Sequence, residues 1–481
     1  MVGLRQIVLC ITLHVIFADA ARILMVLPVP SISHQITFRP ITMELVKRGH
    51  EVVVMTPDPM FKKDEAPANL TEIDVHDLSY EAWQVFMESS KGNKEDLITQ
   101  MRVASQMLID LVDLQLQTEE MKEIIKGKQK FDLLLVEACV RPALAFSHVY
   151  KVPLIQISSF GAIFDNYAVI GAPGHPFLYP SSMNQKIYNL TIYEKLYELY
   201  NNYMINNLLN TMAVGELKML KKHFGPDLPD IYELQNKVEM LFLNVNPIWE
   251  GIRPVPPSVV HLGGLPQKPH KELPQDLKTY LDSSKHGVIY ISFGTNVKPS
   301  LLPAEKIQTL VKAFSKMPYD VLWKWDKDEL PGRSANIRIS KWLPQSDLLK
   351  HPKIKLFVTQ GGLQSTDEAI TAGVPLVGVP MLGDQCYRKN INRLRTLMTD
   401  QPMKPLERGI WWIEHVLRHG GAKHLRAPAA NITWAEYLEF ELIAVVLSAL
   451  LAALAVVIGI VYSLHSFVSR NFIIKAKVKS S

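Results

Sequence analysis

Residues 360–368 combine amides, glycines, hydroxyls and acids in an order that suits a phosphate-bearing ligand. The apolar run at residues 356–359 is expected to form a strand, and a helix is expected to begin near Ser365. Gly361 and Gly362 would turn the chain between them, where larger side chains would block a ligand. The free N–H groups and the positive dipole end at the start of such a helix favour an anion.

Further side chains extend this predicted site. The amide of Gln364 can donate to phosphate, and the carboxylate of Glu368, one helical turn further, can accept from sugar hydroxyls. The indole of Trp342 can stack on a base. A Gly-Gly turn alone is often a plain strand-to-helix connection, so the prediction depends on several segments agreeing. Those segments contribute Ser292, Gly294 and Thr295 after one strand, Trp342 and Gln345 after another, and Asp384 and Gln385 after a third.

Two series of strand and helix signals surround these residues, and each series predicts a parallel sheet. The first has strands at 23–27, 50–56, 131–138, 152–158 and 238–246, the last of these ending the series, and a helix at 40–48. The second has strands at 287–295, 320–325, 354–362 and 375–380. The predicted fold class is α/β, with two doubly wound Rossmann-like domains. Ligands would sit between them at the carboxyl ends of both sheets.

Prolines are concentrated between the two series, which indicates a linker. The predicted parts are a signal peptide at 1–20, a first domain at 21–255, the linker at 256–275, a second domain at 276–440, a transmembrane helix at 442–464 and a tail at 465–481. Residues 187–224 have a long helical pattern rich in Tyr, Leu and Met. Core packing is the expected role of this helix, and a wall of the ligand site or a membrane contact is the alternative.

Both ends of the chain carry targeting signals. The N-terminus has one cation, Arg5, then an apolar core and a small-x-small end at 18–20, which is typical of a secretory signal peptide. Residues 442–464 carry no charge, and as a helix they would cover roughly 30 Å, enough to cross a bilayer. Acidic residues precede this span and basic residues follow it, so we expect a type I protein with a lumenal body. Lys477 and Lys479 fit either an endoplasmic reticulum retrieval signal or ordinary stop-transfer cations.

Composition excludes some classes of function. A net charge of +5 on 481 residues, without a basic block, gives no indication of nucleic-acid binding. Only Cys139 and Cys386 remain once the signal peptide is removed, so the fold must depend on its core and not on a disulfide framework. The predicted glycosylation sites, in agreement with a lumenal body, are Asn69, Asn189 and Asn431.

The stretch WLPQSDLLKHPKIKLFVTQGGLQSTDEAITAGVPLVGVPMLGDQ, at residues 342–385, resembles the signature of the UDP-glycosyltransferases, and most of all the insect membrane-bound members. The resemblance covers nearly the whole chain and implies a GT-B fold. It implies that Trp342 stacks on uracil, that Gln345 binds the base or ribose, and that Glu368 holds the ribose hydroxyls. A UDP-sugar would be the co-substrate, with no cofactor and no metal. The residues implied to meet the diphosphate are Gln360, Gln364 and Ser365, and those implied to hold the transferred sugar are Asp384 and Gln385.

The resemblance places the catalytic step in the first domain, at His34, which we expect in a loop after the first strand. Its neutral imidazole would take a proton from an acceptor hydroxyl. Glu137, where the family usually has Asp, would bond the other ring nitrogen and stabilise the imidazolium. The acceptor oxygen would displace UDP with inversion and give a β-glycoside. The sequence shows no obvious cation for a carboxylate, so glucose is favoured as the sugar. The acceptor would be small and lipophilic, bound around residues 160–179, as in detoxification.

Two departures from the family pattern affect these expectations. Gln360 stands where many members have His, and an amide donates to phosphate without carrying a charge. Roughly forty residues, about one αβα step of a doubly wound sheet, are missing after Tyr387, so we expect impaired stability and donor binding. Two other functions stay open. One is a membrane-anchored binding or regulatory subunit that has lost transfer, as a homo- or hetero-oligomer. The other is a sugar-nucleotide epimerase, which the signal peptide and the span disfavour.

Overall fold

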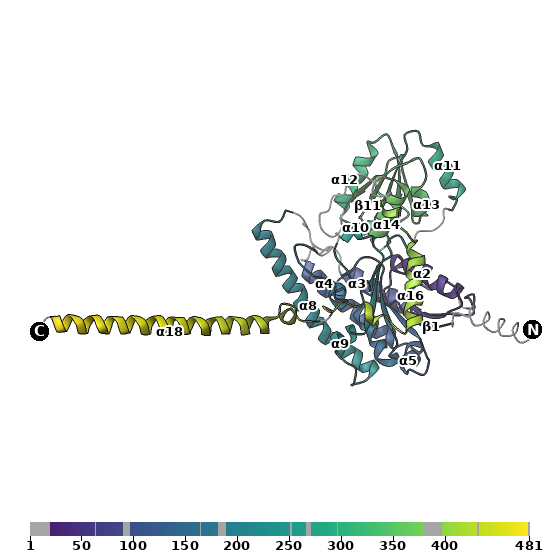
Figure 1. The fold of residues 1–481 in the computed structure, drawn as a ribbon. Helices are drawn as coiled ribbons and strands as arrows, with labels where there is room; N and C mark the ends of the chain where they lie inside the picture. Colours follow the sequence, from purple (N-terminus) through teal and green to yellow (C-terminus); the bar gives the residue numbers. More distant parts are fainter. Residues whose placement is uncertain are drawn as a thin grey trace, which may run out of the picture. The chain divides into compact units, whose positions relative to one another are not determined.

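The computed structural model describes residues 20–62, 64–89, 97–163, 165–180, 189–250, 253–265, 271–295, 297–379, 397–430 and 432–479. The chain divides into two compact units, Met1–Ala430 and Asn431–Ser481. The first unit contains two parallel sheets, each with its own helices (Figure 1). The second is mainly one long helix.

The first sheet has seven parallel strands whose central members are entirely buried. Their apolar side chains pack on both faces, one core cluster on each, as expected for a parallel sheet covered by helices. In spatial order the strands are β3 (Leu70–Asp74), β2 (Glu51–Thr56), β1 (Arg22–Val26), β4 (Leu133–Glu137), β5 (Leu154–Ser158), β6 (Val238–Leu243) and β7 (Val259–His261). The helices of this part are α2 (Ile32–Lys47), α3 (His76–Ser89), α4 (Leu97–Leu116), α5 (Glu119–Ile125), η1 (Arg141–Ala145), α6 (Phe146–Tyr150), α7 (Asn166–Val169), α8 (Ile192–Phe224), α9 (Ile231–Gln235) and α10 (Pro247–Glu250).

The second sheet has five parallel strands and its own two core clusters. In spatial order they are β10 (Ile337–Ser340), β9 (Asp320–Lys324), β8 (Val288–Ser292), β11 (Ile354–Thr359) and β12 (Leu376–Gly378). The helices of this part are α11 (Gln275–Ser283), η2 (Pro299–Leu301), α12 (Ala304–Ser315), α13 (Gln345–Leu349) and α14 (Leu363–Ala372). Two doubly wound parallel sheets confirm the predicted fold class, and each predicted strand is present.

Each sheet has one point where the strand order reverses. In the first sheet the chain leaves β1 toward β2 and later returns to the other side of β1 as β4. In the second sheet the same reversal occurs between β8 and β11. Loops that follow such neighbouring strands diverge, so the carboxyl ends of β1, β4, β8 and β11 are where a doubly wound fold binds ligands.

Three short strands extend the sheets beyond the prediction. The strand at 238–246 was expected to be the last of the first sheet, but β7 follows it and lies inside the predicted 256–275 linker. The prolines on either side of these three residues are typical of a linker, so sequence analysis did not identify the strand. The fold tolerates them because β7 is an edge strand that pairs with β6 alone. The other two, β3 and β10, also lie at sheet edges.

The helix α16 (Pro405–His419) packs on the first sheet, although the prediction assigned residues 276–440 to the second domain. Its buried face, with Ile410, Ile413 and Val416, joins the core cluster that contains Phe38 of α2. The apolar stripe of α16 identifies a packing helix, but a stripe does not say which sheet it covers. A 3-10 turn, η3 (Lys423–Leu425), follows α16.

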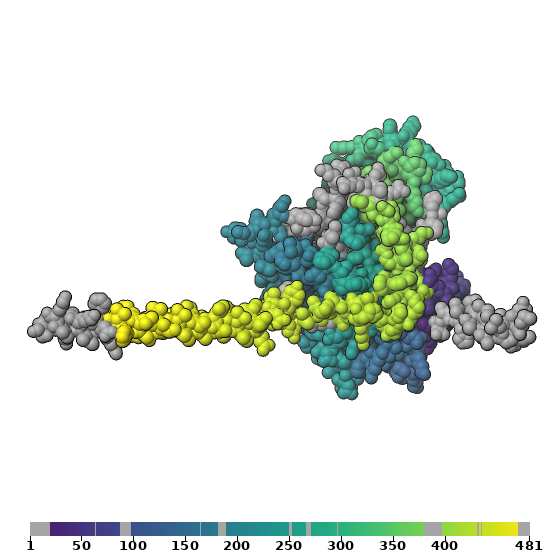
Figure 2. Space-filling model, in the orientation of Figure 1, coloured from purple at the N-terminus to yellow at the C-terminus, as the bar shows by residue number. Residues whose placement is uncertain are grey.

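The helix α8 differs from its expected role along half of its length. Thr191 caps it and forms a capping box with Glu194, which starts the helix. From Leu208 onward one face is buried in the core. The preceding turns are exposed, with Tyr193 at 85% and Tyr203 at 67%, so core packing is wrong for this end. Figure 2 shows this blue end of α8 standing out from the surface.

The second unit contains a short helix, α17 (Trp434–Tyr437), and the long helix α18 (Phe440–Lys479). Within the part of the chain that the structure describes, the stretch Phe440–Ser469 of α18 is the one helix long and apolar enough to cross a membrane. It contains the predicted span at 442–464. The predicted signal peptide, apart from Ala20, and the sequon residue Asn431 lie outside the described residues.

Candidate active site

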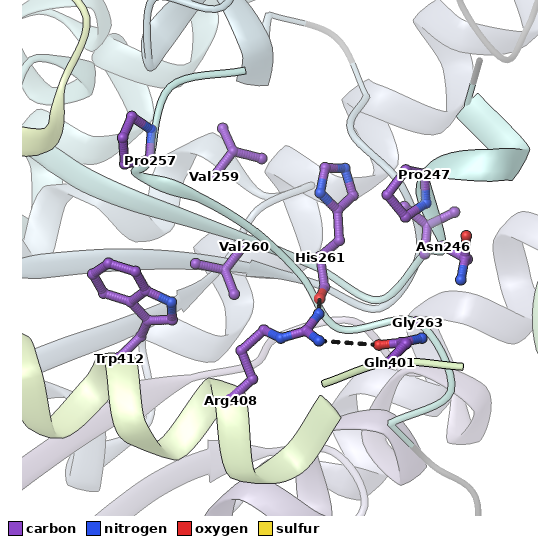
Figure 3. Close-up of a pocket in the computed structure, with 11 residues that line it drawn as sticks. Asn246, Pro247, Pro257, Val259, Val260, His261, Gly263, Gln401, Arg408 and Trp412 are labelled. Carbon is purple, nitrogen blue, oxygen red and sulfur yellow. Dashed lines mark hydrogen bonds between the residues drawn. The ribbon is translucent and has the colours of Figure 1, made fainter. Parts of the chain in front are cut away.

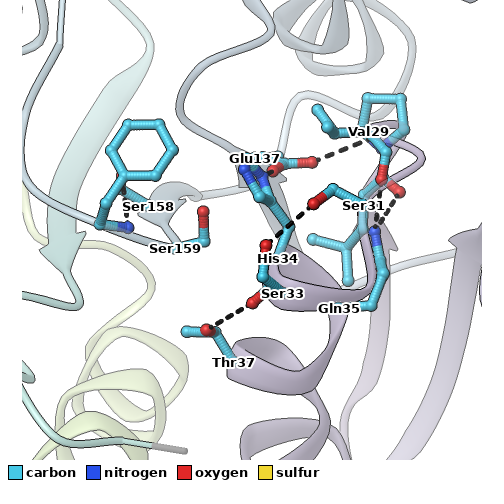
Figure 4. A network of polar contacts seen from close by, with 12 residues as sticks. Val29, Ser31, Ser33, His34, Gln35, Thr37, Glu137, Ser158 and Ser159 are labelled. Carbon is cyan, nitrogen blue, oxygen red and sulfur yellow. Dashed lines mark hydrogen bonds and ion pairs between the residues drawn. The ribbon is translucent and has the colours of Figure 1, made fainter. Parts of the chain in front are cut away.

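His34 and Glu137 meet at the switch point of the first sheet. Glu137 is the last residue of β4 and is completely buried. His34 lies in the first turn of α2, directly after β1, and its Nδ1 is 2.5 Å from Oε1 of Glu137 (Figure 4). The prediction placed His34 in a loop because Pro40 was taken as the helix start. In the structure Pro40 lies inside α2.

The carboxylate of Glu137 is held by two further donors. The backbone N–H of Val29 donates to Oε2 at 3.3 Å, and the Cys139 thiol also donates to Glu137. Burial, together with the charge of Glu137, raises the pKa of Cys139 well above its usual range. The side chain of Gln35 donates to the carbonyl oxygens of Leu27 and Val29, so the loop that leads to His34 is itself fixed.

An aromatic side chain borders His34. The ring of Phe160 meets the imidazole edge to face, with 5.3 Å between the ring centroids and 77° between the planes. Phe160 follows β5, the next strand beside β4, and its N–H donates to Ser158 Oγ at 3.3 Å. Residues 160–179 were the predicted acceptor region, so the structure gives the base an apolar neighbour from that region.

Polar side chains of α13 and α14, together with Tyr290 of β8, form one network in the second sheet. Gln345, the first residue of α13, donates from Nε2 to Ser365 Oγ at 2.9 Å and to Glu368 Oε2 at 2.8 Å. Its Oε1 accepts from the buried hydroxyl of Tyr290 at 3.0 Å. Burial raises the pKa of Glu368, and hydrogen bonds from Gln345 and Gln364 oppose that shift. The structure thus brings together Gln345, Gln364, Ser365 and Glu368.

The two loops at the switch point of the second sheet also lie in contact. Gly294, after β8, has φ +83°, and a Cβ there would lie 2.8 Å from Nε2 of Gln360. Gly361 also has φ +83°, a backbone conformation that favours glycine. Gly362 is the N-cap of α14, which begins at Leu363, two residues before the predicted start. The first N–H groups of α14 therefore follow directly after Gln360 and the two glycines.

Trp342 and an unpredicted cation lie beside these loops. The indole of Trp342 is 63% exposed, so a face of the ring is accessible for stacking. Lys324, the last residue of β9, places Nζ 4.6 Å from the centre of this ring and donates to the carbonyl oxygen of Gly294 at 3.0 Å. Sequence analysis missed Lys324 because a lysine at the end of an apolar run looks like a strand end reaching solvent. Its position at the carboxyl end of β9 was the available signal.

Other predicted site residues have simpler positions. Ser292 ends β8, and its Oγ accepts from the N–H of Gly294 at 3.4 Å. Thr295 lies in the turn that follows. Asp384 and Gln385, the predicted sugar-binding pair, lie outside the described residues. Asp326 begins an Asp-x-Asp sequence at 326–328 that was not among the predicted site residues, and its carboxylate accepts from the backbone N–H and the hydroxyl of Ser300.

The two sheets contact each other through α14. Leu363 packs against the core cluster of the first sheet, and Asp367 is buried beside Trp249 of α10. Burial raises the pKa of Asp367 to about 7, the charge of Glu368 adds to the shift, and a hydrogen bond with Trp249 opposes it. The helix that begins at the predicted phosphate site is therefore anchored on the other domain.

A cavity of about 410 Å³ lies between the β6–β7 edge of the first sheet and α16 (Figure 3). The guanidinium of Arg408 donates to the carbonyl oxygen of His261 at 3.0 Å and to Gln401 Oε1 at 3.2 Å. Burial lowers the pKa of His261 to about 4, and Arg408 and Arg253 add to the effect, so this imidazole stays neutral. The cavity includes none of the predicted site residues.

Two of the predicted glycosylation sites have different surroundings. The side-chain nitrogen of Asn69 donates to the carbonyl oxygens of Val46 and His50, each at 2.8 Å. Asn189 is exposed and has φ +55° just before α8. In the folded chain, the amide of Asn69 is therefore committed to the protein.

Two doubly wound parallel sheets, each with its ligand-binding switch point, define the GT-B fold. The solved complex of a UDP-glucosyltransferase from Polygonum tinctorium, capable of glucosylating indoxyl, with 3,4-dichloroaniline has a similar fold. It is 14% identical, with a TM-score of 0.51, over 84% of this chain and 100% of that one.

Sequence comparison assigns the family. The profile of the UDP-glucoronosyl and UDP-glucosyl transferases matches residues 22–386 and 384–479. The chain is 34% identical over 500 residues to the ecdysteroid UDP-glucosyltransferase of Spodoptera littoralis nuclear polyhedrosis virus, covering 92% of this chain and 96% of that protein. It is 28% identical over 509 residues to UDP-glycosyltransferase UGT5 of Dactylopius coccus, covering 93% of both. The chain belongs to the UDP-glycosyltransferase family, whose members transfer a sugar from a UDP-sugar.

Proposed function

We propose that the protein transfers glucose from UDP-glucose to a hydroxyl of a small lipophilic acceptor, with inversion, to give a β-glycoside. The observation that carries this proposal is the 2.5 Å contact of His34 with Glu137 at the sheet's switch point. Relatives with the printed name ecdysteroid UDP-glucosyltransferase favour glucose as the sugar and a polycyclic alcohol as the acceptor. Phe160 beside the imidazole agrees with an apolar acceptor.

The pair can act as an oriented general base. With Nδ1–H donating to Glu137, the lone pair of Nε2 is left to accept the acceptor's hydroxyl proton. The acceptor oxygen forms a bond to the anomeric carbon while the bond from that carbon to the diphosphate oxygen breaks. Glu137, which is buried and negatively charged, stabilises the imidazolium that forms. Attack opposite the leaving group inverts the anomeric carbon in one step.

The second domain would hold the donor and stabilise the leaving diphosphate. The N–H groups at the start of α14, with Gln360 and Ser365, are donors that suit its oxygens. Trp342 would stack on the uracil, and Glu368, fixed by Gln345, would accept from the ribose hydroxyls. Asp384 and Gln385 are proposed to hold the glucose. Because these groups supply the electrostatic stabilisation, transfer should persist when divalent cations are chelated.

The long helix α18 is proposed to anchor the protein in the endoplasmic reticulum membrane, with its catalytic domains in the lumen. Support comes from the apolar stretch Phe440–Ser469 and from the cations that follow it. In this position the enzyme would meet lipophilic acceptors that partition into the bilayer. An assembly of several chains is compatible with this arrangement.

The test is a comparison of His34→Ala with the unaltered full chain, in membranes supplied with UDP-glucose and a phenolic or sterol acceptor. General base catalysis contributes about 10²–10⁴-fold, so glycoside formation should fall by that factor. Glu137→Gln keeps the shape of the pair but removes the charge, and should also reduce turnover strongly. The matched control is His223→Ala, because His223 forms a similar pair with Asp113, at 2.6 Å, away from the site.

Measurement of the glycoside itself, together with UDP release, separates transfer from hydrolysis of the donor. The anomeric coupling in the product's NMR spectrum should report a β-linkage. Unchanged glycoside formation in His34→Ala would refute the catalytic assignment, and an α-linked product would refute inversion.

A further inference from the structure

We propose that His34, Glu137 and Cys139 also form a binding site for a thiophilic divalent cation such as Zn²⁺, and that the bound cation switches the base off. A ring nitrogen of His34, a carboxylate oxygen of Glu137 and Sγ of Cys139 all lie within 4.8 Å of one another. Imidazole, carboxylate and thiolate are the three protein ligands that zinc prefers. The fourth position would be taken by water.

The backbone presents these three groups from two rigid places. Glu137 ends β4 and Cys139 follows two residues later, while His34 comes from the first turn of α2. Ligand atoms around a tetrahedral zinc ion lie roughly 3.3–3.7 Å apart, given bonds of about 2.0–2.3 Å. The contact between Nδ1 and Oε1, now 2.5 Å, would therefore open by about 1 Å, which a side-chain rotation can supply. The sulfur of Cys139, now within 4.8 Å of both other ligand atoms, would adjust to the same spacing.

The charges also favour a cation at this place. One carboxylate and one thiolate balance the two positive charges of Zn²⁺, so the buried complex is neutral. Arg141, the nearest cation in the sequence, is occupied elsewhere, since its guanidinium pairs with Glu216 at 3.1 Å. On binding, the thiol proton leaves to water as the metal–sulfur bond forms. The metal would thereby replace the hydrogen bonds that His34 and Cys139 now donate to Glu137, and the bond from the Val29 N–H would remain.

The bound cation would stop general base catalysis by reversing the imidazole tautomer. Glu137 contacts Nδ1, so a cation held between them binds Nδ1 and moves the ring proton to Nε2. Nε2 then has no lone pair to accept the acceptor's proton. This inhibitory effect rests on the proposed function, whereas binding of the cation does not. The site regulates the reaction and supplies none of its chemistry.

Co²⁺ provides a direct test of binding, because cobalt bound to a thiolate gives a charge-transfer absorption band. The chain without its signal peptide, freed of any histidine tag and carrying Cys386→Ser to remove the other remaining cysteine, should show this band with a molar equivalent of Co²⁺. Zn²⁺ should abolish the band by competition. Cys139→Ser and His34→Ala should each weaken Co²⁺ binding by at least about tenfold, because even the loss of a residue that only supports a metal ligand typically costs 10–100-fold. In Cys139→Ser the thiolate band should disappear altogether.

The matched control is again His223→Ala, since the pair of His223 and Asp113 has similar geometry but no cysteine ligand within the described set. This variant should keep the band. A protein without a thiolate band, or a band that survives Cys139→Ser, would overturn the proposed site.

The activity arm tests the switch separately. Zn²⁺ should reduce glycoside formation by the full chain, a chelator should restore it, and Cys139→Ser should raise the inhibitory concentration at least about tenfold. UDP binding measured alongside should not change with Zn²⁺. Cobalt binding without any transferase activity would sink the proposed function and leave the metal site standing. Inhibition that is equal in the wild type and Cys139→Ser would sink the switch.

Discussion

At the scale of single residues, two buried carboxylates and one half-buried carboxylate illustrate how environment decides chemistry. Glu137 is completely buried but accepts from Val29 and His34, so its charge is compensated and available to orient a base. Glu368 accepts from Gln345 and is prepared to bind hydroxyls. Asp367, which directly precedes Glu368, is 3% exposed, and its Oδ1 lacks a hydrogen-bond partner among the described residues.

This difference predicts that the ionisation of Asp367 makes the stability of the fold depend on pH. Its pKa is about 7 in the fold, against an ordinary value of 3.8, so its favourable contribution is complete below about pH 4. The contribution is lost as the pH rises from about 4 through 7, because the unfolded chain ionises Asp367 in this range while the fold keeps it protonated. Asp367→Asn should therefore be more stable than the wild type at pH 8, by about 4 kcal/mol at most, and similar at pH 4. Thermal unfolding of both proteins across this range is the measurement, and parallel pH curves would contradict it.

At the scale of elements, the loops after β8 and β11 must approach closely to form the donor site. Gly294→Ala would strain a residue at φ +83° by roughly 1–2 kcal/mol and would push Gln360 away from its position. We expect lower stability together with a several-fold higher KM for the UDP-sugar. Gly49→Ala is the control, because Gly49 has φ +92° and open space around it. Steady-state kinetics should show the KM effect in Gly294→Ala alone, and an equal KM in both variants would refute the role of this contact.

A second element-scale prediction concerns the glycans. Asn69 sits at the start of β3 with its amide nitrogen bound to two carbonyl oxygens, whereas Asn189 is exposed before α8. We expect a glycan at Asn189 and little at Asn69 in protein from insect cells. Asn189→Gln should then remove a glycan-sized shift in electrophoretic mobility that Asn69→Gln leaves in place. The reverse pattern would show that modification precedes the folding of β3.

At the scale of the whole molecule, the two sheets of the first unit are linked because the chain passes from the second sheet back to the first. The helix α16 returns from the second sheet to the first, where Arg48 pairs with Glu414 at 2.9 Å and Arg408 bonds to His261. The family profile matches in two segments that meet at 384–386, and the alignment to the viral relative, 500 residues long, exceeds the 481 residues of the chain. Both findings support a missing internal segment just before this crossing.

Restoring that segment should improve the enzyme. Insertion of the corresponding stretch of the Spodoptera littoralis virus relative after Tyr387 is expected to raise the melting temperature by roughly 2–8 °C, the shift that about 1–2 kcal/mol produces in domains of 150–250 residues. The KM for the UDP-sugar should fall, because Asp384 and Gln385 precede the insertion point. A Gly/Ser insert of equal length is the control. Identical melting temperature and turnover with both inserts would refute the prediction.

The reach of sequence analysis differed between the core and the edges. Strands β1, β4, β8 and β11 were predictable because central strands of a parallel sheet are short, uninterrupted apolar runs. The edge strands β3, β7 and β10 escaped, since they are less apolar or flanked by proline. The start of α2 escaped as well, because Pro40 imitates a helix start. For the candidate site, the residues of the 342–368 motif were predictable from local spacing, whereas Lys324 was recognisable only by its neighbours in the fold.

The sequence by itself determined the family, the two βαβ series and the chemical character of the site, because these depend on local patterns of side chains. The tertiary structure decided which residues meet. The contact between His34 and Glu137 joins residues 103 apart in the chain, and it exists because β1 and β4 are neighbours at the switch point of the first sheet. The structure also decided that Cys139 completes a possible cation site and that α16 packs on the first sheet. Such contacts arise from the order of strands and the packing of helices, and no local pattern in the sequence encodes that order.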